Sequence, residues 1–169
     1  MLERFDRTLL AANRWALIAM LAAMATMVFA NVALRFLTDA SILWVEEVSR
    51  YLMIWLTFLG AGLVLRYGGH VGIDTLQEAL PRQAAVIRGG IVAILLAFFA
   101  FMIVVGLRYA VLAWGQTTPV LGIPVGAVYL AMPIGFALLV AHLLLMARGY
   151  VSRRQLLADG QFDSVAAKL

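Results

Sequence analysis

The residues with the clearest chemical potential form a compact ionic cluster, which reads Glu46-Glu47-Val48-Ser49-Arg50-Tyr51. On a helix, Glu46 lies one turn before Arg50 and Glu47 lies just under one turn before it, so both carboxylates can reach the guanidinium group. Carboxylates inside membranes often serve as proton or ion sites. No second ladder of charged residues continues inward from this cluster. The pattern therefore favours structural pairing or docking over a proton relay.

The position of the cluster follows from the length of its helix. Only 15 residues separate Arg50 from Arg66, which is about 22 Å of helix and too short to cross ~30 Å of hydrocarbon. We therefore expect the helix to begin near Leu43. The cluster would then lie just below the interface on the outer side of the membrane. One arginine cannot satisfy two carboxylates, so a further partner is expected from Arg35, Arg108 or another subunit.

Other chemistries find little support. The chain has no cysteine and two histidines, His70 and His142. A membrane cytochrome needs paired axial histidines on facing helices, and His70 falls in a loop. No nucleophile triad, metalloprotease spacing or phosphate-binding loop is present. We expect no catalytic, metal or cofactor site, and no nucleic-acid partner.

The composition indicates the solvent that surrounds these residues. Of the 169 residues, 64% are hydrophobic and 13% are charged, whereas soluble domains carry about 25% charged residues. The chain is therefore predicted to be an all-α integral membrane protein that contacts lipid. We expect one four-helix membrane domain over residues 1–147 and a cytoplasmic tail over 148–169. The expected spans are approximately 15–35, 43–65, 88–114 and 125–147.

The distribution of positive charge predicts the orientation. Ten of the 13 Lys and Arg residues lie in the N-terminal segment, the second loop and the tail, whereas Arg35, Arg50 and Arg108 lie on the opposite side. By the positive-inside rule both termini are cytoplasmic. Trp44 and Trp114 then fall at the far ends of their spans, in the headgroup layer. The first apolar stretch is longer than a signal-peptide core, which favours an uncleaved helix.

Three connecting segments carry their own predictions. Residues 2–9 suit a short amphipathic helix or, equally, a frayed terminus. Residues 73–80 have capping-box spacing and an apolar face, which predicts a short helix along the cytoplasmic interface. Residues 115–126 contain Pro119, Pro124 and Gly122, a composition typical of an ordered, non-helical turn on the outer face.

Small residues recur every fourth position in the last two spans. The two stripes are Gly89, Ala93 and Ala97, and Ala127, Ala131 and Gly135. Such stripes allow helices to approach closely in lipid, so we expect internal helix contacts, with a partner protein as the second choice. Pro133 is expected to kink the fourth span.

Several segments together resemble one family, the small membrane subunit (Q component) of tripartite ATP-independent periplasmic (TRAP) transporters. The resemblance covers about residues 14–147. The matching segments are Asn31 to Phe36, Trp44 to Tyr51, Trp55 to Ala61, Arg66, Gly69 to Val71, Leu121 to Pro124, Tyr129, and Pro133 to Gly135.

The resemblance implies a role in sodium-driven uptake at the bacterial inner membrane. In this family a periplasmic binding protein captures the substrate, usually an organic acid, and a large elevator-type subunit holds the transport path and the sodium sites. The small subunit is a static scaffold and part of the docking surface, without ATP hydrolysis. The candidate interface or structural residues are Asn31, Arg35, Trp44, Glu46, Glu47, Arg50, Tyr51, Gly122, Pro124, Tyr129 and Pro133.

Two other functions remain open from the sequence. The chain can be a self-sufficient carrier or channel that works as a homo-oligomer, with Glu46 or Glu47 as its ion site. A structural membrane protein of an unrelated pathway is the more distant alternative. The transported substrate does not follow from the sequence, because specificity would reside in other polypeptides.

Overall fold

The computed structural model describes residues 2–66 and 84–153, and they are helical apart from short connections. The helices are α1 (Leu2–Thr38), α2 (Leu43–Arg66), α4 (Ala84–Leu112), α5 (Val125–Tyr129) and α6 (Ala131–Arg153). Four segments, with α5 and α6 together forming the last, are long and apolar enough to cross a membrane. This confirms the predicted all-α membrane fold. The predicted interfacial helix at 73–80 lies outside the described residues.

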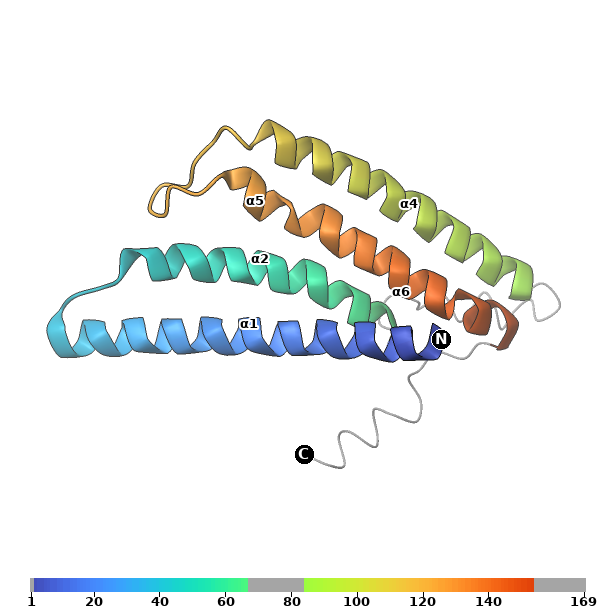
Figure 1. Cartoon of the computed structure of the whole chain (residues 1–169), viewed down its shortest axis with the longest axis horizontal. Helices are drawn as coiled ribbons and strands as arrows, with labels where there is room; N and C mark the ends of the chain where they lie inside the picture. Colours follow the sequence, from blue (N-terminus) through green and yellow to red (C-terminus); the bar gives the residue numbers. More distant parts are fainter. Residues whose placement is uncertain (1, 67–83, 154–169) are drawn as a thin grey trace, which may run out of the picture.

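The long helices form an open row (Figure 1). Helix α1 packs on α2, α2 packs on α6, and α6 packs on α4. The α1–α2 and α4–α5 connections lie together at one end of the row, which we call the loop end. Helix α1 begins and α6 finishes at the opposite end, the terminal end. The edge helices α1 and α4 thus each have one main neighbour among the long helices.

Helix α1 is longer than the predicted first span. It has 37 residues and is therefore about 56 Å long. The expected amphipathic segment at 2–9 is part of this one helix, because nothing between Leu2 and Thr38 interrupts it: the stretch contains neither glycine nor proline. Asn13, which is buried, donates from Nδ2 to the carbonyl oxygen of Leu59 at 3.1 Å and ties α1 to α2.

The last span is broken near its start, as its proline predicts. Helix α5 stops at Tyr129 and α6 begins at Ala131. Pro133 has no N–H group to donate to the Tyr129 carbonyl, so the regular helix is interrupted one turn before it. Helix α6 also continues to Arg153, six residues beyond the expected end at Ala147.

The middle of the row is held by aromatic side chains. Phe136 on α6 lies between Phe58 on α2, with ring centroids 6.1 Å apart, and Phe99 on α4, at 5.7 Å. Phe98 also meets Phe136, edge to face at 6.0 Å. Such tilted and edge-on pairs are favourable ring arrangements. Helix α6 is therefore the centre of packing.

One small-residue stripe packs as predicted and the other does not. Ala131 and Gly135 are buried in the row. The prediction that Gly89, Ala93 and Ala97 form internal contacts is wrong, because Ala93 and Ala97 are exposed and no atom lies within 4 Å of the position of a Cβ at Gly89. Periodicity alone does not say which face of an edge helix has a neighbour.

Gly135 is a point of close backbone approach between α6 and α2. A Cβ at this position would lie 2.6 Å from Phe58 Cβ and 2.8 Å from the Phe58 carbonyl oxygen. Gly135→Ala should therefore destabilise the fold by about 1–3 kcal/mol through overpacking. Gly60→Ala is the matched control, since nothing lies within 4 Å of its Cβ position, and it should change stability by under about 1 kcal/mol. Unfolding in detergent measures both; equal effects would contradict the close approach.

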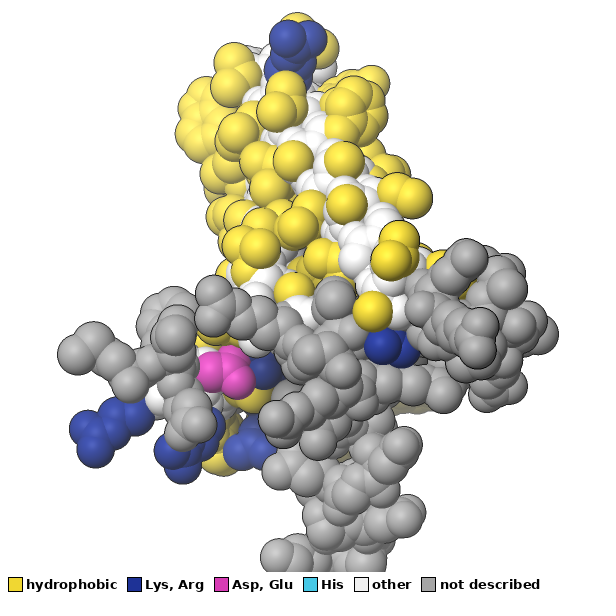
Figure 2. Space-filling view, turned by 90° about the vertical axis from the view of Figure 1, so that its right-hand side faces the viewer, with side chains coloured by type: hydrophobic (Ala, Val, Ile, Leu, Met, Phe, Trp, Pro, Cys, Tyr) yellow, Lys and Arg dark blue, Asp and Glu magenta, His cyan; other side chains and the backbone are white. Residues whose placement is uncertain are grey.

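The surface of the row suits lipid. Viewed from the terminal end, hydrophobic side chains cover most of the described surface in the upper part of the view, and Arg side chains lie at its top and in its lower part (Figure 2). Large apolar residues are exposed along α1 and α4, among them Phe29 at 76% and Ile94 at 71%. Soluble monomers rarely expose apolar surface on this scale, so these faces meet lipid or another membrane protein.

Candidate functional site

The loop end contains the predicted acidic cluster, and Glu47 is its buried member. Glu47 lies on the second turn of α2 with only 5% of its surface exposed. Its Oε1 accepts a hydrogen bond from the Tyr51 hydroxyl at 2.8 Å, and its Oε2 accepts from the backbone N–H of Val120 at 2.8 Å and of Leu121 at 3.3 Å. The Thr118 side chain is a further partner. Both carboxylate oxygens are thus engaged.

The segment that meets Glu47 is an ordered turn between α4 and α5, as predicted. Thr117 and Pro124 form an isolated antiparallel bridge, and the Thr118 N–H donates to the Ile123 carbonyl at 2.9 Å. Gly122 has φ +66°, the left-handed region that favours glycine. The turn thereby presents the neighbouring amides of Val120 and Leu121 to the carboxylate of Glu47 on α2.

The predicted pairing of both carboxylates with Arg50 does not form. Glu47 uses partners contributed mainly by the turn, and Glu46 and Arg50 are exposed on the surface. Within the described ranges, neither carboxylate forms an ion pair with Arg50. The i, i+3 and i, i+4 spacings make contact sterically accessible, but an ion pair between exposed side chains gains little in water. Within the cluster, Glu47 is therefore a buried structural acid, whereas Glu46 and Arg50 are surface charges.

Three other candidate residues lie at the same end. Asn31 Oδ1 accepts a hydrogen bond from the Ile42 N–H at 2.7 Å and fixes the connection between α1 and α2. Arg35 is exposed and lines a groove between these helices that Glu46 also lines. Trp44 is 43% exposed at the start of α2. The sequence analysis expected these roles to be structural or interfacial.

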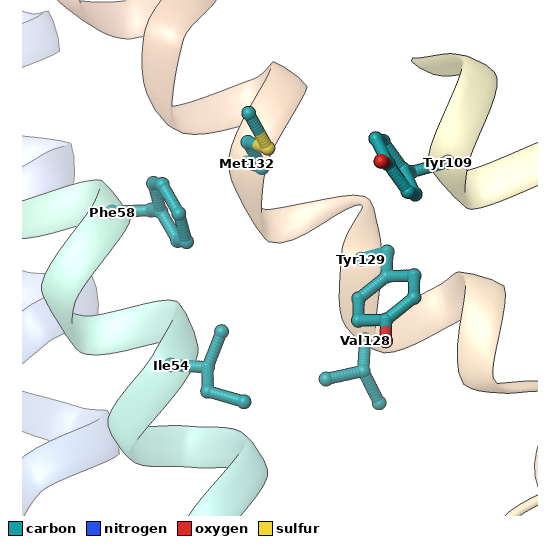
Figure 3. Close-up of a pocket in the computed structure, with 6 residues that line it drawn as sticks. All are labelled: Ile54, Phe58, Tyr109, Val128, Tyr129 and Met132. Carbon is teal, nitrogen blue, oxygen red and sulfur yellow. The ribbon is translucent and has the colours of Figure 1, made fainter. Parts of the chain in front are cut away.

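Tyr129 and Pro133 lie by the break between α5 and α6. Pro133 is buried against Gly106 of α4, where a Cβ would lie 2.9 Å from the proline Cδ. Tyr129 lines an apolar cavity of about 250 Å³ with Ile54, Phe58, Tyr109, Val128 and Met132. Figure 3 shows these side chains projecting from α2, α4 and the broken span toward one space. The cavity offers no charged group for an ionic substrate.

The terminal end holds a polar cluster that the sequence analysis missed. Arg66, which is 2% exposed, makes a two-pronged ion pair with Asp6: Nη1 donates to Oδ2 at 2.9 Å, and Nη2 contacts Oδ1. Its Nε donates to Nδ1 of His142 at 3.0 Å. One guanidinium therefore joins α1, α2 and α6.

His142 is wholly buried and accepts through Nδ1, so its proton in the neutral ring is on Nε2. Within residues 2–66 and 84–153 that nitrogen has no hydrogen-bond partner, and it lies against Gly62, 3.2 Å from where a Cβ would be. A larger residue at 62 would displace the imidazole. The sequence signal was weak, because Asp6 is one of two acids, with Glu3, among the arginines of the N-terminal segment.

The two polar clusters are at opposite ends of the row, and aromatic side chains fill the space between them. Among the described residues no three His, Cys, Asp or Glu side chains are grouped to hold a metal ion. Both buried carboxylate contacts join one helix to another segment. These features define a multi-pass membrane protein whose polar groups join its own helices.

The particular family follows from comparison with known proteins. Residues 24–152 match the family model described as "Tripartite ATP-independent periplasmic transporters, DctQ component". The chain belongs to this family of small TRAP permease subunits. It is therefore a component of a transporter, and a bacterial inner-membrane protein whose family works with a large membrane subunit.

Several relatives show how widely the family is used. The chain is 35% identical over 129 residues to a putative TRAP transporter small permease protein of Haemophilus influenzae, covering 75% of this chain and 80% of the relative. It is 34% identical to the ectoine small permease TeaB of Halomonas elongata, over 67% of this chain and 60% of that one. It is 27% identical to the isethionate permease DctMQ of Oleidesulfovibrio alaskensis, over 66% of this chain but only 18% of the relative.

Proposed function

We propose that this chain is the static scaffold of a sodium-driven TRAP transporter. It supports a large elevator-type subunit and forms part of the surface on which a periplasmic binding protein docks during uptake of an organic acid. In this proposal the large subunit uses the sodium gradient, and the small subunit has no cofactor and catalyses no reaction. The match of a much longer permease to this chain over 18% of its length is consistent with a small part joined to a large one.

The observation that carries the proposal is the apolar middle of the row. Phe58, Phe136 and Phe99 occupy the space between the two polar clusters, so the described helices offer no polar route for an ion or an organic acid. The rival hypothesis of a self-sufficient carrier assigns the ion site to Glu46 or Glu47. Glu47 has both oxygens engaged by protein donors, which argues against a free ion site there.

The docking part of the proposal depends on the loop end. Glu46, Arg50 and Arg35 are exposed there and carry charges of both signs. Charged rims steer partner association and set its register. In the proposed orientation this end faces the periplasm, where a soluble binding protein would meet it.

The orientation has a direct test. Ten of the 13 Lys and Arg residues lie in the N-terminal segment, in the tail, and within or beside the 67–83 connection at Arg66, Arg82 and Arg88, so reporter fusions after Gly69 should report the cytoplasm and fusions after Gly122 the periplasm. Alkaline phosphatase and green fluorescent protein provide opposite readouts at each position. The reversed pattern would put the loop end on the wrong side for periplasmic docking.

Reconstitution tests the function. Liposomes that contain this chain alone should show no sodium-dependent flux, whereas liposomes with the large subunit and binding protein should take up substrate when a sodium gradient is applied. The Glu46→Gln/Glu47→Gln variant should leave the sodium dependence and stoichiometry of its residual transport unchanged. Flux through this chain alone, or altered stoichiometry in the variant, would favour the carrier hypothesis.

The substrate requires its own assay. Relatives named for ectoine and for isethionate resemble this chain to similar degrees, so resemblance of the small subunit does not select a substrate. We infer that selectivity resides in the binding protein and the large subunit. Exchange of the binding protein should alter which organic acid is taken up.

A further inference from the structure

The groove between α1 and α2 at the loop end combines opposite charges with an apolar floor. It has a volume of about 330 Å³ and is lined by Arg35 and Glu46, by the polar side chains of Ser41 and Ser49, and by Val28 and Val32. Arg35 and Glu46 are both exposed, and they form no ion pair with each other in the described chain. A ligand that carries one charge of each sign can therefore bridge them.

A second observation points to an occupant. The Ser49 hydroxyl oxygen is buried and has no hydrogen-bond partner among the described residues, although buried polar atoms are nearly always paired. Ser49 is one of the residues that line the groove. A bound polar group would give this hydroxyl a partner.

The shape along α1 identifies the kind of ligand. Val28 lies seven residues before Arg35, about 10 Å farther from the loop end along the helix. The apolar lining therefore extends toward the middle of the span, and the charges lie near its end. Trp44, which is exposed at the start of α2, is typical of the layer of lipid headgroups. An occupant with a zwitterionic head and an attached hydrocarbon chain matches both regions.

We propose that this groove binds a zwitterionic phospholipid with an ammonium headgroup, such as phosphatidylethanolamine. Its phosphate lies by Arg35, its ammonium by Glu46, and an acyl chain follows Val32 and Val28. Arginine suits phosphate oxygens because its planar N–H groups match their geometry. A peptide side chain from a docking protein would complement the charges but would leave the apolar floor open.

Native mass spectrometry of the full chain, purified with its large subunit, tests the proposal. The complex should retain added phosphatidylethanolamine in preference to phosphatidylglycerol. Glu46→Gln and Arg35→Gln should each lower this retention about fivefold or more, the loss expected for one charge-assisted hydrogen bond. Val28→Trp, which keeps both charges but fills the apolar floor, should lower it as well.

Matched controls use charges outside the groove. Asp39→Asn and Arg108→Gln remove one exposed charge of each sign at the same end and should leave retention unchanged. Equal retention by all variants, equal loss in the controls, or no preference over phosphatidylglycerol would overturn the proposal. Displacement of the lipid by phosphoethanolamine at equal concentration would show that only a headgroup is recognised. Unchanged lipid retention with weakened docking of the binding protein would assign the groove to that protein.

Discussion

Replacement of Asp6 with asparagine is expected to destabilise the folded chain by about 3–5 kcal/mol, the cost of removing one partner from a buried ion pair. The substitution keeps the side-chain size but removes the charge that neutralises Arg66. That guanidinium is 2% exposed, and among the described residues His142 would be its remaining side-chain hydrogen-bond partner. Unfolding of the purified chain in mixed micelles gives the free energy.

A double-mutant cycle separates the ion pair from nonspecific damage. Arg66→Met removes the buried charge, and Asp6→Asn/Arg66→Met should be less destabilised than the sum of the single variants. Asp39→Asn is the control, because Asp39 is an exposed acid in the α1–α2 connection, and it should change stability by less than about 0.5 kcal/mol. Strict additivity of the two single effects would mean that the pair contributes no coupling.

Glu47→Gln should detach the turn between α4 and α5 from α2. The carboxylate accepts from two backbone amides and a tyrosine hydroxyl, whereas glutamine has one oxygen and presents an NH₂ group to donors. Loss of charged hydrogen bonds typically costs about 1.5–3 kcal/mol. Hydrogen exchange should show faster exchange at the amides of Val120 and Leu121, together with lower stability of the chain.

The neighbouring acid supplies the control. Glu46→Gln makes the same chemical change one residue earlier, at an exposed side chain, so exchange in the turn should be unaffected. If both variants speed exchange in the turn equally, the turn is held by the net charge at the start of α2 and not by the specific hydrogen bonds of Glu47. If neither opens it, the bonds to Val120 and Leu121 contribute little.

The membrane fold was predictable because lipid imposes simple requirements on a chain. Apolar stretches of sufficient length predicted four spans, and the shortness of residues 51–65 correctly extended α2 back to Leu43. Pro133 predicted a kink, and the structure has an interruption at Leu130, one turn before the proline, because a residue without an N–H group cannot complete the regular helix. The composition of residues 115–126 likewise predicted the ordered turn.

The polar contacts were less predictable because they join distant positions. Local spacing assigned Glu47 to Arg50, but its main partners lie 73 and 74 residues away. Asp6 and Arg66 are 60 residues apart, and no local pattern connects them. The stripe at Gly89 looked like a helix contact, yet α4 is at the edge of the row and turns these residues outward. These contacts depend on which helices are neighbours in the row, and local periodicity does not encode that order.

The arrangement of the ion pair also bears on how the protein enters the membrane. Chains are made from the N-terminus at about 5–20 residues per second, so α1 and α2 are synthesised before α6. Arg66 can form its ion pair with Asp6 within this first hairpin, before His142 has been synthesised. Glu47 cannot complete its hydrogen bonds at this stage, because Val120 and Leu121 belong to the second half of the chain. The nascent hairpin therefore has Arg66 paired at the terminal end, while Glu47 at the loop end is bonded to Tyr51 alone among the described residues of the hairpin. The loop end is then the last part of the row to form its contacts.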